Sequence, residues 1–358
     1  MKHKDFLRLS LAGWMVRLLP LLFALMVPVA APAGTYWNFA YTVKSNNTID
    51  ITGYTGIDDT VTIPAAIKGL PVTGIGVEAF NKCRSLTSVT IPASVTSIGE
   101  RAFSGCSGLP HIAIPESVIR IGDEAFLGCG LTNVVIPESI TSIGEEVFSG
   151  CTNLTSVTIP GRVTNLGKGA FSGCTHLATV TIQGAITDIG DSAFSGCTRL
   201  ADITIPDSVA SIGDWAFASC SRLINITIPK SVTHIGDRAF YKCAGLTGVY
   251  FQGNAPSVDP DAFLYSSKAT IYYLKGTKGW NTQFGGRPTG WWKPQARTTE
   301  VGSTSRNSAP EAHTNLFGGV SEILQPDAPA AGSIQFGAPQ SKDDQPYRIH
   351  VSQPDLSD

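Results

Sequence analysis

The sequence predicts a repeat solenoid, a fold in which short coils of chain stack on one another. Phenylalanines recur every 23 residues, with a single step of 22, and the first eight are each followed three positions later by a cysteine. A period of roughly 20–29 residues indicates units that are too small to bury an apolar face alone and must therefore stack. The recurring phenylalanines are Phe80, Phe103, Phe126, Phe148, Phe171, Phe194, Phe217, Phe240 and Phe263.

Residues 1–33 precede the repeats and predict a secretory signal peptide. Four Lys or Arg residues come before an apolar run over 18–30, which ends in the small residues of Ala31-Pro32-Ala33. A membrane anchor is the weaker interpretation, because two prolines interrupt a run shorter than the roughly 20 residues that a span needs. We therefore expect an exported protein, secreted or at the cell surface, with no membrane span after removal of residues 1–33.

The charge balance excludes some partners. The 358 residues carry a formal net charge of −2, and loss of residues 1–33 would make it −5. Nucleic acids and anionic membrane surfaces attract strongly basic proteins. Neither is expected as a partner.

Residues 34–56 predict an N-terminal cap. They contain two apolar, β-prone segments separated by Asn46-Asn47, which is the pattern of a β-hairpin. A stack of repeats needs protected ends, so we interpret this hairpin as the cover of the first coil.

Each repeat predicts a short buried strand followed by two corners. In the unit 86–108, Val89 and Ile91 alternate with polar residues, and Pro92 lacks the amide that would continue the ladder. An irregular stretch leads to Gly99, and an acidic residue follows, where a carboxylate suits the start of a helical turn. We expect a turn or two of helix to bury Phe103 and its neighbours.

Nine such repeats span 57–264. The aromatic segment 265–292 is expected to close the last coil, and 293–358, rich in Ser, Pro, Ala, Gly and Gln, predicts a disordered tail.

The repeat Leu-x-x-Val-x-Ile-Pro-x-Ser-Val-x-x-Ile-Gly-x-x-Ala-Phe-x-x-Cys resembles the BspA-type leucine-rich repeat, over 57–264. The resemblance implies a leucine-rich-repeat horseshoe with one long parallel β-sheet on one face and short helical turns or loops on the other. Some members of this family are surface adhesins. Local departures are Gln183-Gly184 in place of Ile-Pro, Leu166 and Val258 in place of Ile, and Ser266 in place of a ninth cysteine.

The cysteines allow two interpretations. An even number in an exported chain can indicate disulfides, but equivalent partners above and below each cysteine would make the pairing ambiguous. A ladder of buried free thiols filling one column of the core is favoured. The column is Cys83, Cys106, Cys129, Cys151, Cys174, Cys197, Cys220 and Cys243.

No motif of catalysis is present. The sequence contains no Gly-x-Ser-x-Gly, His-Glu-x-x-His, phosphate-binding or dinucleotide-binding pattern, and its single cysteines lack the pairing typical of zinc sites. The chain is therefore not expected to be an enzyme or to hold a metal or cofactor.

The outward positions of the predicted strands are rich in hydroxyl and amide groups. Such a broad face suits an extracellular protein or glycan ligand, although strand propensity alone also favours threonine. We expect a monomeric, adhesin-like binding protein; a self-associating envelope protein is the alternative, and an ice-binding protein or an enzyme is disfavoured. The predicted binding residues are Thr90, His111, Asn133, Thr158, Thr181, Asp202, Thr204, Asn225, Thr227 and Tyr250.

Overall fold

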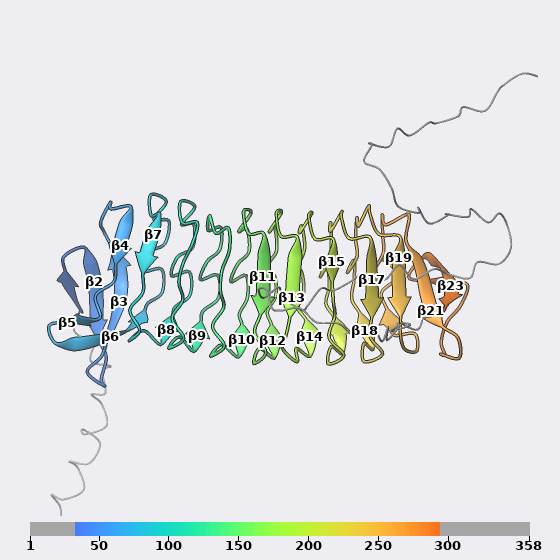
Figure 1. Cartoon of the computed structure of the whole chain (residues 1–358), viewed down its shortest axis with the longest axis horizontal. Helices are drawn as coiled ribbons and strands as arrows, with labels where there is room; N and C mark the ends of the chain where they lie inside the picture. The colour runs from blue at the N-terminus through green and yellow to red at the C-terminus, as the bar shows by residue number, and fades with distance from the viewer. Residues whose placement is uncertain (1–32, 294–358) are drawn as a thin grey trace, which may run out of the picture. The chain divides into compact units, whose positions relative to one another are not determined.

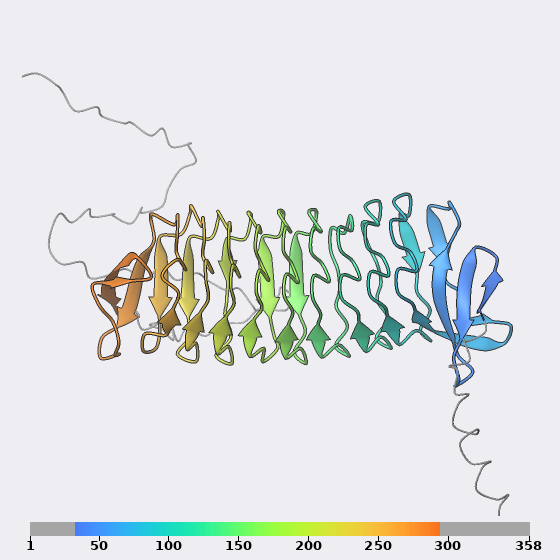
Figure 2. The ribbon, with the colours of Figure 1, turned by 180° about the vertical axis from the view of Figure 1, so that it is seen from behind.

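The computed structural model describes residues 33–293, and this part of the chain consists of strands and turns without a helix. Its coils follow one another in chain order along an axis that Figures 1 and 2 show with little curvature, so the horseshoe bend is slight. The predicted signal peptide, apart from Ala33, and the predicted tail, apart from Lys293, lie outside the described residues.

The first coil is covered by antiparallel strands. β1 pairs with β2, and β2 pairs with β3 across a turn in which Asn47 has a φ of 59°. A second hairpin joins β5 to β6, and β3 passes the sheet on to β6 in parallel. Ala33, the last residue of the predicted signal peptide, is the first residue of β1. These strands are β1 (Ala33–Tyr36), β2 (Phe39–Val43), β3 (Ile49–Tyr54), β5 (Ala66–Ile67) and β6 (Leu70–Ile75).

The strands predicted in the repeats form parallel ladders on one side of the stack. The ladder is interrupted: β4 pairs with β7, β11 to β15 form a second group, and β17 begins a third. Residues 111–114 and 133–136 occupy equivalent positions without pairing, because Pro110 has no amide to donate and the coil that follows is one residue short. The single continuous sheet is therefore a correction to the sequence prediction. These strands are β4 (Thr60–Thr62), β7 (Ser88–Thr90), β11 (Ser156–Ile159), β13 (Thr179–Ile182), β15 (Asp202–Ile203), β17 (Asn225–Ile228) and β19 (Gly248–Phe251).

A second parallel ladder runs along another side, at the segment that the sequence analysis treats as irregular. It is built from residue pairs such as Ser97 and Ile98, most of which precede a recurring glycine. The second residue of each pair is a buried isoleucine, or Leu166 in β12, except for the half-buried Val258 of β20. It has two paired groups, one that runs from β6 through β8 to β9 and one that runs from β10 to β20. Beyond β6, its strands are β8 (Ser97–Ile98), β9 (Arg120–Ile121), β10 (Ser142–Ile143), β12 (Asn165–Leu166), β14 (Asp188–Ile189), β16 (Ser211–Ile212), β18 (His234–Ile235) and β20 (Ser257–Val258).

The third side, here called the turn side, lies around the recurring phenylalanines and is not helical. Alternate amides donate to the next coil, as Phe103 N does to Ala125 O at 2.8 Å, while those between them close turns within the coil, as Ser104 N does to Arg101 O at 3.0 Å. A helix would use all of these amides within one coil. Residues two before and two after the phenylalanine have positive φ, 51° at Arg101 and 73° at Gly105. The expected helical turns are thus a row of tight turns bonded across coils.

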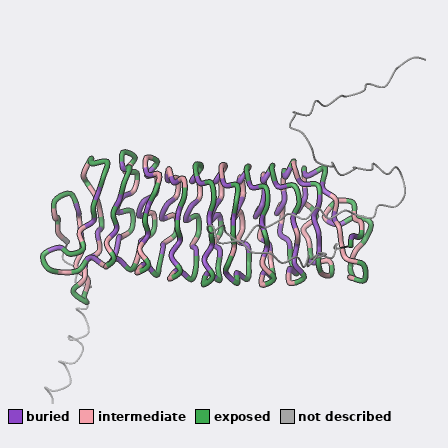
Figure 3. Tube along the Cα trace, viewed as in Figure 1, coloured by how far each residue is buried: buried purple, intermediate pink, exposed green. Residues whose placement is uncertain are grey.

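The core consists of residue columns that run the length of the stack (Figure 3). From Phe80 to Phe263, neighbouring phenylalanine rings are stacked with centroids 5.0 to 5.7 Å apart and planes within 12° of parallel. Burial of one such side chain contributes about 2–3 kcal/mol. Each coil thereby supplies a surface that only the next coil can cover.

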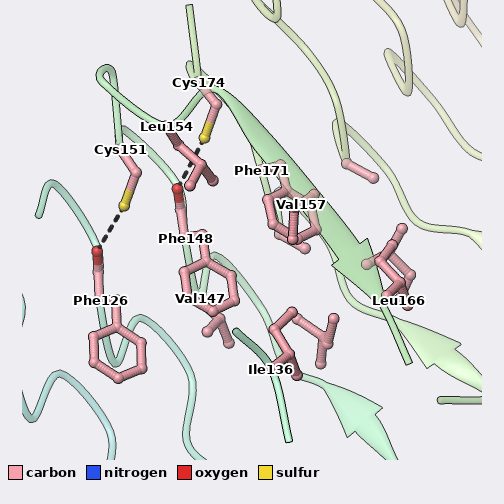
Figure 4. Packing of buried hydrophobic residues seen from close by; sticks show 14 of the residues in the cluster. Phe126, Ile136, Val147, Phe148, Cys151, Leu154, Val157, Leu166, Phe171 and Cys174 are labelled. Atoms are coloured by element: carbon pink, nitrogen blue, oxygen red, sulfur yellow. Dashed lines mark hydrogen bonds between the residues drawn. The ribbon is translucent and has the colours of Figure 1, made fainter. Parts of the chain in front are cut away.

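The eight cysteines form a second core column as free thiols, with seven buried and Cys83 half-buried. From Cys106 to Cys243, each thiol donates to the carbonyl of the phenylalanine 25 or 26 residues earlier, at 3.0 to 3.2 Å. Figure 4 shows this contact between Cys174 and Phe148. At the ninth position the Ser266 hydroxyl makes the same bond to Phe240 O at 2.6 Å.

The last coil is covered by aromatic residues. β21 pairs in parallel with β19 and continues the ladder. β23 pairs in parallel with β21 and antiparallel with β22. Phe251, Trp280 and Phe284 pack with ring centroids 4.9 to 5.4 Å apart. The strands are β21 (Thr270–Leu274), β22 (Gln283–Phe284) and β23 (Arg287–Trp292).

Candidate binding surface on the strand face

The strand face is the outer side of β4, β7, β11, β13, β15, β17, β19 and segments 111–114 and 133–136. Apolar residues of these strands, such as Val157 and Ile159, point into the core, so the residues between them point outward. Most of the predicted binding residues are exposed there: Thr90, His111, Asn133, Thr158, Thr181, Asp202, Thr204 and Asn225, with Thr227 half-buried.

A row of hydroxyls lies at its centre. Thr158 pairs in register with Thr181, and Thr204 continues the same column one coil further. Threonines just before these strands donate their hydroxyls to backbone carbonyls of the preceding coil. Thr155 Oγ1, for example, donates to Thr132 O at 3.2 Å. Within residues 33–293, the hydroxyls of Thr158, Thr181 and Thr204 have no hydrogen-bond partner. They remain able to donate to a ligand and accept from it.

A polar cluster occupies the unpaired part of the face. His111 Nδ1 lies 2.7 Å from Asn133 Oδ1, so a proton on Nδ1 lets the ring donate to the amide oxygen. The Thr132 hydroxyl also approaches Nδ1, at 3.3 Å. The structure thus brings together two predicted site residues that are 22 positions apart in sequence.

Tyr250 differs from its prediction, because the structure buries it. Its ring stacks on Tyr272 at 5.0 Å, and Trp292 covers it edge-on at 5.4 Å. Burial, with a smaller contribution from Tyr272, raises the pKa of the Tyr250 hydroxyl. Tyr250 therefore belongs to the cover of the last coil, and the open strand face ends at Thr227.

Two exposed apolar residues lie on this face, and neither is among the predicted binding residues. Val135 stands in the hydroxyl column with 75% of its surface exposed, and Ile224, which precedes β17, is 53% exposed. The repeat pattern places Val135 in an outward column of the strands, whereas Ile224 lies just before its strand and belongs to neither outward column. They flank the threonine row and give a ligand apolar contacts at its two ends.

The described residues offer little for other chemistry. Among residues 33–293, no three His, Cys, Asp or Glu side chains gather as metal ligands would. No helix within that range is long and apolar enough to cross a membrane. Burial raises the pKa of the Cys151, Cys197 and Cys243 thiols to about 12, which keeps them protonated and poorly nucleophilic.

Stacked parallel coils that carry Leu, Val and Ile at fixed core positions define a leucine-rich repeat protein. The family model of the BspA type leucine rich repeat region matches residues 73–200 and 150–270 in 6 copies. These matches cover more than half of the chain, and the chain belongs to this family. No curated protein sequence matches it.

Several solved bacterial structures are similar. A leucine rich repeat protein of T. pallidum is 32% identical, with 60% of this chain and 91% of that one covered and a TM-score of 0.48. A leucine rich cell surface protein of Faecalibacterium prausnitzii is 28% identical, with 69% and 89% covered and a TM-score of 0.46. A leucine-rich repeat protein of Bacteroides ovatus is 26% identical, with 67% and 70% covered and a TM-score of 0.50.

Proposed function

We propose that this chain is an extracellular, adhesin-like binding protein that recognises a protein or glycan ligand on its strand face. The observation that carries the proposal is the row Thr158, Thr181 and Thr204, whose exposed hydroxyls are left without partners within the described residues. The pairing of β11 with β13 sets the spacing of Thr158 and Thr181, and Thr204 directly follows β15, which pairs with β13. A ligand with polar groups at a matching spacing would bond to several of them at once.

The backbone supports binding through many weak contacts. Recognition costs free energy when side chains and loops become ordered on the ligand. Here the strands are already held by backbone ladders and by the stacked rings beneath them, so binding removes little further conformational freedom. Asp202 is the one Asp, Glu, Lys or Arg among the outward residues from Thr60 to Thr227, so the face is largely uncharged and suits an uncharged polar ligand.

Exposure outside the cell is part of the proposal and rests on the predicted signal peptide. One cell-surface protein is among the similar structures. We propose secretion followed by action as a monomer, with self-association through the strand face as the alternative that the experiment below separates.

The experiment is a binding screen with matched variants. The purified chain is immobilised and exposed to matrix proteins, a glycan array and whole cells. A T158K/T181K/T204K variant places three long cations on the strand face. A T141K/T164K/T187K variant adds the same charge at exposed positions beside the second ladder.

We expect a ligand whose binding is lost in the first variant and kept in the second. Binding that both variants keep, or that both lose, would refute the strand face as its site. Sedimentation of the free chain at micromolar concentration tests self-association. Assembly of the wild type that T158K/T181K/T204K abolishes would replace the foreign ligand by a second copy of this chain.

A further inference from the structure

The turn side changes character along the stack. Two residues after the core phenylalanine, the coils in the middle carry Gly105, Gly128, Gly150, Gly173 and Gly196, and the position before it is mostly serine. In the last two coils the same two positions hold larger side chains, which are Tyr241, Lys242, Leu264 and Tyr265. Neither the core nor the ladders require this change.

Tyr241, Lys242 and Tyr265 gather with Trp215 and Arg238, which lie two residues before Phe217 and Phe240. These five residues are here called the aromatic cluster. The Tyr241 ring lies 5.0 Å from Trp215 and 5.4 Å from Tyr265, centroid to centroid. Trp215 is 36% exposed and Tyr265 is 65% exposed. Three coils thus present a continuous row of rings to solvent, on a different side from the threonine row.

Two of these side chains occupy backbone positions that suit glycine. Lys242 has a φ of 53° and Tyr265 a φ of 63°, where Gly173 and Gly196 stand in earlier coils with φ near 70°. A bulky residue in the left-handed region costs conformational energy that glycine avoids. Lys82 and Ser219 adopt the same conformation at this position of other coils, with φ of 61°, so the cluster is distinguished by its rings and charges and not by its backbone.

Two cations accompany the rings in different ways. The Arg238 guanidinium lies 5.2 Å from the centre of the Trp215 ring and is paired with the carboxylates of Asp237 and Asp261. Lys242 Nζ lies 5.1 Å from the centre of Tyr241 and 6.0 Å from that of Tyr265, and within the described residues it forms no ion pair. Its charge is therefore available to a ligand.

The size of the cluster decides between partner classes. Three neighbouring coils, about 5 Å apart, span roughly 10 Å between the outer strands or turns. A stable protein interface needs about 800 Å² from each partner, with 20–30 residues a side. A short ligand with apolar faces for the rings and polar edges for the charged groups fits better, and sugar rings have this character: C–H groups cover their faces and hydroxyls their edges.

We propose that the aromatic cluster is a second binding site and that it takes an acidic oligosaccharide. The sugar faces stack on Trp215 and Tyr265, Asp237 and Arg238 hydrogen-bond to hydroxyls, and Lys242 pairs with a sugar carboxylate. This site is independent of the strand face and of the function proposed for it.

The test uses the purified chain on an array of oligosaccharides that contain uronic or sialic acids, beside their methyl esters, which keep the rings and lose the charge. A W215S/Y265G variant installs the residues that the coil of Phe194 carries at these two positions, Ser192 and Gly196, so we expect it to fold. K242Q removes only the charge, and T158K/T181K/T204K serves as the control on the other face.

We expect acidic oligosaccharides to bind to the wild type and to the strand-face variant equally. W215S/Y265G should weaken binding at least tenfold. K242Q should weaken binding to the acids about tenfold, with little effect on the methyl esters. The absence of any bound acidic glycan, or hits that W215S/Y265G retains, would overturn the proposal, as would equal binding of acids and esters. Circular dichroism and thermal melting establish that each variant is folded.

Discussion

The inside and the outside of the stack follow different rules. In the core, the phenylalanine column is unchanged from Phe80 to Phe263, and only Ser266 departs from the thiol column. On the outside, equivalent positions change from coil to coil: His111, Asn133, Ser156, Thr179 and Asp202 occupy one column of the strand face. The comparison teaches that repetition in this chain serves stacking, whereas variation among outward positions marks where recognition can occur.

The largest change in the free energy of unfolding is expected at alkaline pH, because deprotonation acts on several thiols of the column at once. The folded thiols of Cys151, Cys197 and Cys243 have a pKa raised to about 12 by burial, against 9.0 for an exposed thiol. The folded state therefore keeps protons that the unfolded chain releases, and the free energy of unfolding falls as pH rises from about 9 to about 12. Each unit of pKa difference is worth about 1.4 kcal/mol.

Urea denaturation between pH 7 and 12 measures this slope. C151S/C197S/C243S, whose hydroxyls do not titrate in this range, should show a shallower decline than the wild type. Equal slopes would show that the buried thiols do not control alkaline unfolding.

Removal of one ring from the middle of the core should come next. Phe171→Ala leaves a cavity between Phe148 and Phe194 and should lower the free energy of unfolding by about 3–5 kcal/mol. Since each coil contacts only its neighbours, the two halves of the stack should then unfold in separate steps. Calorimetry of Phe171→Ala beside the milder Phe171→Leu measures both effects. A single transition with an unchanged midpoint would contradict the dependence of each coil on its neighbours.

A smaller change in stability is expected from substitutions on the turn side, at the position two residues after the core phenylalanine. Its sign should depend on whether the coil carries glycine there. Gly173 has a φ of 70°, so Gly173→Ala should cost about 1 kcal/mol. Ser219 has a φ of 61° at the equivalent position, so Ser219→Gly should raise the free energy of unfolding by a similar amount. Thermal melting of the two variants checks the pair, and two shifts of the same sign would show that φ does not govern this column.

The smallest effect is expected within the thiol column itself. Ser266 already donates to Phe240 O as the cysteines donate to their phenylalanines, so Cys174→Ser should keep the bond to Phe148 O and cost less than about 1 kcal/mol. Cys174→Ala removes the donor and should cost more. If urea denaturation ranks them in the opposite order, the bond to the carbonyl contributes little.

The sequence predicted the core columns and the strand face because side-chain spacing reports directly which residues are buried. It did not predict the second ladder or the turns on the third side. Both depend on backbone amides, such as Phe103 N, whose partners in the next coil leave no mark in the side-chain pattern. Tyr250 was misplaced for another reason: its cover, Trp292, comes from outside the repeat.

The candidate sites divide in the same way. The threonine row follows from the alternation of β11, β13 and β15, and was predicted residue by residue. The aromatic cluster was missed because the sequence analysis used the residues that all coils share. It did not compare the positions that vary from one coil to the next. Comparison of Gly196, Ser219, Lys242 and Tyr265, which stand at one position of successive coils, would have shown it.

The amide contacts on the turn side carry a consequence for the length of the array. Phe103 N donates to Ala125 O and Phe194 N to Ala216 O in the same geometry, both at 2.8 Å. On the turn side, each coil therefore offers nearly the same donors and acceptors to the next. We expect that insertion or deletion of a whole 23-residue segment would change the length of the array and keep these bonds.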